Sequence, residues 1–138
     1  MEIKNNNKRE LTIPLQAIDI ESRTVEIAFC SELPAKRKIN DKDYNEILLC
    51  STENVDLRRL NQNAALLWNH DPNAIIGSVL SARMDADRVG RATVRISNTA
   101  ENIWQMILEG TLTHISVGYF INDFRIDGDN IIVTSFTP

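Results

Sequence analysis

Apolar and polar residues alternate along two neighbouring stretches near the start of the chain. In residues 24–29, Val25, Ile27 and Phe29 alternate with Thr24, Glu26 and Ala28, and residues 11–20 follow a looser version of the same pattern. A period of two is typical of half-buried β-strands. Only residues 21–23 separate the two stretches, so we predict a β-hairpin. Residues 1–10 are polar and contain an asparagine triplet, which predicts a flexible N-terminal tail with order beginning near Leu11.

Similar patterns predict further strands towards the C-terminus. Residues 75–96 contain an apolar run, the turn-forming residues 85–90, and then a second alternating stretch, which together indicate another hairpin. A strand around residues 114–124, a tight turn at 127–130 and a returning strand at 131–136 complete this series. Residues 34–43 are charged and aperiodic, and we expect an exposed loop there. Residues 44–68 contain short apolar runs that fit a buried strand or a short helix equally well.

One helix is expected between residues 98 and 110. Asn98 can cap its free amides, Glu101 stands three residues later as in a capping box, and Gly110 provides a left-handed stop. Four apolar residues between them fall on one face at helical spacing, and we interpret them as core residues: Ile103, Trp104, Ile107 and Leu108. The predicted fold class is therefore α+β and mostly antiparallel β, with one domain over residues 11–138.

Composition and charge narrow the classes of function. The chain has 138 residues, of which 43% are hydrophobic and 25% charged, and its net charge is −4. This balance gives no basic footprint for nucleic acid. The longest apolar run, residues 64–68, is far shorter than the roughly 20 residues of a membrane span, so no membrane partner is expected. Cys30 and Cys50 form no C-x-x-C pair, which argues against zinc and predicts two reduced core thiols.

Two histidines and one serine are the candidates for chemistry. His70 stands where an apolar run meets a turn containing Pro72, so its imidazole could emerge at a strand or loop end. In a strand, His114, Ser116 and Gly118 would share one face, and Gly118 would let a substrate backbone approach closely. A serine hydroxyl needs a base to become a good nucleophile, and imidazole has a suitable pKa. The G-x-S-x-G elbow is absent, which excludes an α/β-hydrolase.

Two motifs resemble the tailed-phage prohead serine proteases, the capsid-maturation proteases. The first is N-H-D-x-x-x-x-I-G, read here from Asn69 to Gly77, and the second, about 40 residues on, is E-G-x-L-x-x-x-S-x-G-Y, read from Glu109 to Tyr119. Both occur in the family's order and cover roughly residues 60–122. The resemblance implies the fold of the herpesvirus maturational proteases, a partly open β-barrel flanked by helices. It also implies His70 as general base and Ser116 as nucleophile.

The same resemblance implies a biological setting. The chain would be a serine endopeptidase that processes scaffold and capsid polypeptides, without a cofactor or a metal, in the cytoplasm of an infected or lysogenic bacterium, inside the assembling prohead. Homo-oligomerisation stays open. In the family, the third triad member is an acidic residue in a phrase like L-E-x-S-L-V, which follows a segment similar to residues 131–138. We therefore expect this member beyond Pro138, in a longer polypeptide.

Three alternatives remain open. His114 could be the third triad member, since the herpesvirus enzymes use a second histidine, although theirs follows the serine. A non-catalytic capsid-assembly or scaffold domain could keep the fold without the activity. A metal site at His70, Asp71 and His114 is a weaker hypothesis, because three ligands of this kind underfill a metal's coordination.

Overall fold

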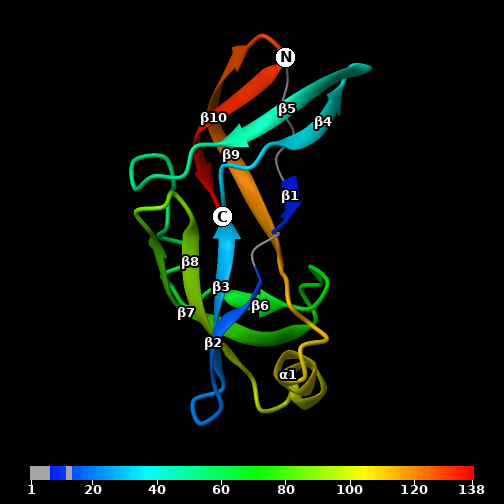
Figure 1. The fold of residues 1–138 in the computed structure, drawn as a ribbon, viewed down its shortest axis with the longest axis vertical. Helices are drawn as coiled ribbons and strands as arrows, with labels where there is room; N and C mark the ends of the chain where they lie inside the picture. The colour runs from blue at the N-terminus through cyan, green and yellow to red at the C-terminus, as the bar shows by residue number, and fades with distance from the viewer. Residues whose placement is uncertain (1–6, 12–13) are drawn as a thin grey trace.

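Two five-stranded sheets contain most of the residues of the computed structural model, which describes residues 7–11 and 14–138 (Figure 1). The first sheet has the spatial order β1 (Asn7–Glu10), β9 (Ser116–Asp127), β10 (Asn130–Thr137), β5 (Lys42–Leu48) and β4 (Ala35–Ile39). The second has the order β2 (Gln16–Asp19), β3 (Thr24–Cys30), β8 (Gly90–Ile96), β7 (Ile75–Met84) and β6 (Ala65–Leu67). Every described strand pair is antiparallel except β5 with β10. The mostly antiparallel β prediction is confirmed.

The first sheet curls so that its two edge strands approach each other. The Arg37 side chain on β4 donates a hydrogen bond of 3.0 Å to the Lys8 carbonyl on β1. Arg9, also on β1, donates to the Leu33 carbonyl just before β4, at 2.8 Å. Side chains therefore bridge the two edges, and the sheet approaches a closed barrel.

The prediction that helices flank this barrel is wrong. The described residues contain one α-helix, α1 (Glu101–Leu108). Its Trp104 and Ile107 are buried, as predicted, while Leu108 is exposed. The predicted cap is also wrong, because Ala100 occupies the N-cap without a side-chain bond, and Glu101 instead accepts hydrogen bonds from Arg23 and Gln105. Gly110 has a φ of 80°, in agreement with its predicted stop.

The charged segment 34–43 is a hairpin and not a loop. Ala35, Arg37 and Ile39 of β4 are half-buried, and the lysines between them are exposed, so the strand alternation is present but carried by charged residues. Asn40 and Asp41 have φ of 52° and 63°, the two left-handed residues of the tight turn that connects β4 to β5. The sequence shows no apolar alternation here, because most of the residues that alternate are charged.

Residues 7–10 of the predicted N-terminal tail form a strand instead. Asn7–Glu10 form β1, which pairs with β9 next to Ser116, whereas residues 1–6 lie outside the described part. The half-buried strand predicted in residues 11–20 is reduced to β2, whose four residues are all exposed. The 75–96 hairpin is confirmed as β7 and β8. Of the ambiguous stretch 44–68, residues 44–48 belong to β5 and residues 65–67 to β6.

One buried cluster contains residues from both sheets. Val25, Val94 and Ile96 of the second sheet belong to the same apolar cluster as Ile131 and Phe136 of the first. Cys30 and Cys50 are also fully buried there and are not joined by a disulfide, as predicted. This shared core fixes the two sheets against each other, and that packing matters because each sheet supplies one of the two candidate catalytic residues.

Candidate active site

His70 lies in a tight turn of the segment that connects β6 to β7. The Asp71 amide donates to the Trp68 carbonyl at 3.0 Å, which closes a four-residue turn with Asn69 and His70 at its centre. Both central residues have a left-handed backbone, with φ of 52° and 55°. Asparagine and histidine tolerate this conformation better than most residues do. The Asp71 carboxylate accepts the Asn73 amide at 2.9 Å and thus stabilises the same loop.

Ser116 is the first residue of β9, in the other sheet. Its Oγ lies 2.8 Å from His70 Nε2. The predicted approach of these two side chains is therefore confirmed, across 46 residues of sequence and between two sheets. The geometry is that of a serine hydroxyl whose proton can pass to an imidazole.

The surroundings of His70 favour its neutral form. Burial, and then the positive charge of Lys8, lower the pKa of His70 below its ordinary value. A neutral imidazole has one nitrogen free to accept a proton, so the histidine is in the correct state for a general base near neutral pH.

Gly118 lies beside the imidazole of His70. A Cβ built at Gly118 would lie 4.0 Å from His70 Nδ1, an ordinary van der Waals distance, so the ring itself does not require a glycine at this position. Within residues 7–11 and 14–138, the structure shows no carboxylate bonded to that Nδ1. The approach of a substrate backbone at Gly118 stays a prediction.

His114 is exposed and precedes β9, so the predicted strand face begins only at Ser116. The reason is that residues 111–115 are tied to the N-terminal segment by isolated bonds, such as Leu15 N–H to the Thr113 carbonyl, instead of a continuous ladder. His114 Nδ1 lies 2.8 Å from Thr113 Oγ1, and Ser116 is the hydrogen-bond partner recorded for His70. A role for His114 as a third triad member remains a prediction.

Strand β1 adds two charged residues that were not among the predicted site residues. Glu10 pairs with Ser116 and Lys8 pairs with Gly118, and cross-strand partners project to the same side of a sheet. Both side chains therefore lie on the face that carries the serine. They were missed because a polar N-terminal segment with no apolar alternation resembles a tail.

A second set of charges is buried on the opposite face of β9. Glu46 on β5 is 2% exposed and makes ion pairs with Arg9 at 2.8 Å and Arg37 at 3.3 Å. The Tyr119 hydroxyl on β9 donates to the same carboxylate. Four strands thus meet at one buried acid. A signal was present, because Glu46 alternates in step with the partly buried Tyr44 and the buried Leu48, which places a charge on the inward face.

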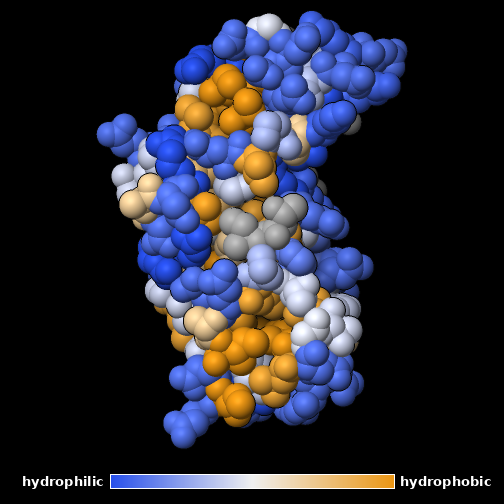
Figure 2. Space-filling model, in the orientation of Figure 1, coloured by the Kyte–Doolittle hydropathy of each residue, from blue (hydrophilic) through white to orange (hydrophobic). Residues whose placement is uncertain are grey.

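The Ser116–His70 pair lies in a large groove with a volume of about 1240 Å³. Its apolar lining includes Leu66, Leu112 and Ile115, and its charged lining includes Lys8 and Arg59. Hydrophobic side chains also gather in the lower half of the face seen in Figure 2, around β2 and α1. A groove of this size can hold several residues of an extended peptide.

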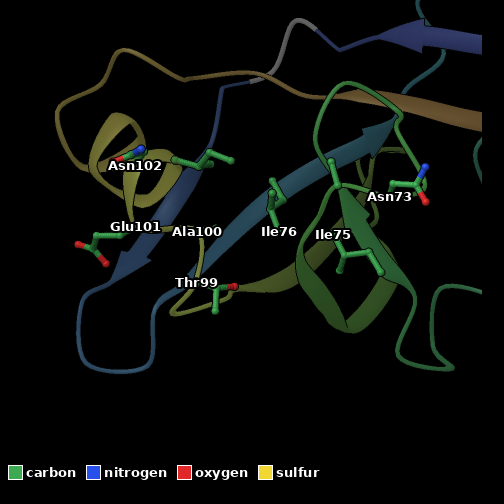
Figure 3. A pocket seen from close by; sticks show the side chains of 9 residues that line it. Asn73, Ile75, Ile76, Thr99, Ala100, Glu101 and Asn102 are labelled. Carbon is green, nitrogen blue, oxygen red and sulfur yellow. The ribbon is translucent and has the colours of Figure 1, made fainter.

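A smaller hollow of about 330 Å³ lies between the start of β7 and the start of α1. Figure 3 shows Asn73 and Ile75 on one side and Thr99 to Asn102 on the other. Its lining contains no histidine, serine or cysteine. The one hydroxyl of its lining, on Thr99, therefore has no histidine beside it to act as a base.

Neither a metal centre nor a membrane helix is found in the described part of the chain. No three His, Cys, Asp or Glu side chains gather there in a way that could hold a metal ion. None of the helices described is long and apolar enough to cross a membrane.

Residues 38–136 match the profile of a known family, described as the Caudovirus prohead serine protease. The matched region includes His70, Ser116 and Glu46. The chain belongs to this prohead serine protease family. The family resemblance that the two motifs indicated is thereby confirmed.

A curated relative of this prohead protease domain is a capsid protein. The chain is 35% identical, over 102 residues, to the "Major capsid protein" of Halomonas phage phiHAP-1. The match covers 70% of this chain but only 16% of the capsid protein, so the chain spans about a sixth of that relative. No solved structure matches the chain.

Proposed function

We propose that this chain is a serine endopeptidase domain that processes capsid and scaffold polypeptides during phage prohead maturation, inside the assembling prohead. The observation that carries the proposal is the 2.8 Å contact between Ser116 Oγ and His70 Nε2, which line a large groove in a member of the prohead protease family. Ser116 is the nucleophile and His70 is the general base.

The geometry supports the following order of events. His70 takes the hydroxyl proton while Ser116 Oγ attacks the peptide carbonyl, and a tetrahedral intermediate forms. The imidazolium then gives that proton to the leaving amine, so the C–N bond breaks and an acyl-enzyme remains. Water, activated by the same histidine, hydrolyses the ester. A hydrogen-bond partner for Nδ1 would stabilise the imidazolium.

The test is labelling of Ser116 by a fluorophosphonate, followed by mass spectrometry, on the 138-residue chain and on any longer natural chain. We expect modification of Ser116, with loss of labelling in Ser116→Ala and strong slowing in His70→Gln. Ser81→Ala, which changes an exposed serine on β7, is the matched control and should label normally. Cleavage of co-expressed capsid and scaffold proteins should follow the same pattern. Equal labelling of wild type and His70→Gln would contradict the proposed base.

A second candidate function is a non-catalytic capsid-assembly domain. The likeness to a major capsid protein favours it, because in that relative a region similar to this chain is part of a capsid polypeptide. If no form of the chain reacts with the probe or cleaves capsid protein, while the domain still binds immature capsids, this second function is supported.

A further inference from the structure

The groove around Ser116 and His70 contains two basic side chains without an acidic partner. Lys8 and Arg59 both line the groove, and neither makes an ion pair with any residue that the structure describes. Most other arginines of the described ranges do pair with a carboxylate: Arg9, Arg23, Arg37, Arg58, Arg83, Arg88 and Arg91. In a chain of net charge −4, the candidate active-site groove therefore presents two cations that no described carboxylate pairs with.

Both cations lie on the same side of the serine along β9. Lys8 is the cross-strand partner of Gly118, and the Arg59 guanidinium is 5.4 Å from the centre of the Phe120 ring. Gly118 and Phe120 are two and four residues beyond Ser116, on the same face of the strand. The rise per residue of a strand places Gly118 about 6–7 Å from Ser116 and Phe120 about 13 Å from it. The spacing matches positions two and four of an extended peptide.

No described carboxylate of the groove forms an ion pair with these cations. Glu10 is the one acidic side chain among the described lining residues, and it lies opposite Ser116 and not beyond it. Arg59 rests against an aromatic ring, which holds its planar guanidinium without using its hydrogen-bond donors. Those donors are left for a ligand.

We propose that Lys8 and Arg59 form a subsite for an acidic side chain of the substrate, within four residues of the scissile bond on the Gly118–Phe120 side. This inference deepens the proposed function and rests on it. A carboxylate in this subsite gains charge-assisted hydrogen bonds to Arg59, with Lys8 adding attraction nearby. A neutral isostere leaves both cations without that gain, so discrimination follows from charge.

The test compares quenched peptides that carry Glu or Gln at each of four positions on either side of the bond that is cleaved. At one position, Glu should raise kcat/KM about tenfold over Gln. Arg59→Gln should abolish this preference, and Lys8→Gln should weaken it. Arg125→Gln is the control, since Arg125 is exposed on β9 and forms no described ion pair. Arg59→Glu should reverse the preference in favour of Lys at the same position.

Binding of the same peptides to Ser116→Ala, measured by fluorescence anisotropy, separates this inference from catalysis. Cleavage without any Glu preference, or a preference that survives Arg59→Gln, overturns the subsite and leaves the protease intact. A Glu preference in binding without cleavage by wild type supports the subsite and contradicts the peptidase. If the chain neither cleaves the peptides nor prefers Glu in binding, the subsite and the proposed peptidase function are both overturned.

Discussion

At the scale of single residues, the site depends on the charges around one imidazole. His70 is partly buried on a left-handed turn, bonded to Ser116 at one nitrogen and near Lys8. Burial and a neighbouring cation act in the same direction on its pKa. The histidine is thereby kept unprotonated over a wider pH range than a free histidine.

Replacing Lys8 with Met should raise the pKa of His70. The substitution removes a positive charge that opposes the imidazolium, so protonation becomes easier. NMR titration of the ring protons checks the pKa directly. The acidic limb of kcat/KM, which reports the free enzyme's base, should move to higher pH by the same amount. Lys36→Met, on the exposed side of β4, should change neither; an unaltered His70 titration in Lys8→Met would refute the electrostatic explanation.

The two thiols should be inert while the chain is folded. Cys30 and Cys50 are fully buried, and the hydrogen bond with Cys50, together with burial, raises the pKa of the Cys30 thiol. We expect no reaction with a thiol reagent such as iodoacetamide in native buffer and two equivalents after denaturation. Rapid modification of either cysteine under native conditions would show that the core is less closed than described.

At the scale of elements, short segments hold the site through a few packed side chains. Helix α1 has only eight residues, too few to be stable alone in water. It is held by Trp104 and Ile107, which are buried in the shared core, and by Arg23, whose guanidinium stacks 5.2 Å from the centre of the Trp104 ring. The segment that leads into β9 and Ser116 begins directly after this helix.

Trp104→Ala should lower the free energy of unfolding by about 3–5 kcal/mol, the usual cost of an aromatic cavity. Gln105→Ala is the matched control, because Gln105 is exposed on the same helix. Its effect should stay within about 0.5 kcal/mol. Urea denaturation, followed by far-ultraviolet circular dichroism instead of tryptophan fluorescence, measures the free energy of unfolding of both variants. A Trp104→Ala variant as stable as wild type would be incompatible with the buried position.

At the scale of the whole molecule, closure of the first sheet depends on a buried acid. Glu46 connects β5 to β1 and β4 through two arginines and to β9 through Tyr119. Burial, followed by the bond to Glu46, raises the pKa of Tyr119, which keeps its hydroxyl protonated as a donor. This cluster positions β1, and therefore Lys8 and Glu10, beside the serine.

Glu46→Gln should be strongly destabilising, because it leaves two arginines without their buried counter-charge. The expected loss is about 3–5 kcal/mol in the free energy of unfolding, measured by urea denaturation. Glu26→Gln provides the comparison, since Glu26 pairs with Arg83 in an exposed network. Its loss should not exceed about 1 kcal/mol. Equal effects of the two substitutions would mean that the buried cluster does not hold the sheet together.

The local features of this protein are predictable from its sequence. Period-two alternation identified β3 and the β7–β8 hairpin. The apolar spacing of Trp104 and Ile107 identified the helix, and two motifs identified the family. These features depend on nearest neighbours and on residue type.

Which charged residues are buried, and which strands pair across the chain, became visible only in the folded structure. β1 and β4 are polar strands, and each is held in the sheet by an arginine bonded to Glu46. Arg9 of β1 is 37 residues from Glu46 in sequence, and Arg37 of β4 is 9 residues from it. The contact between His70 and Ser116 was expected from their motifs, but the Lys8–Arg59 side of the groove exists only because an apparently unstructured N-terminal segment pairs with β9. No local sequence pattern predicts the pairing of β1 with β9, because the contacts that stabilise it are made by residues far apart in the sequence.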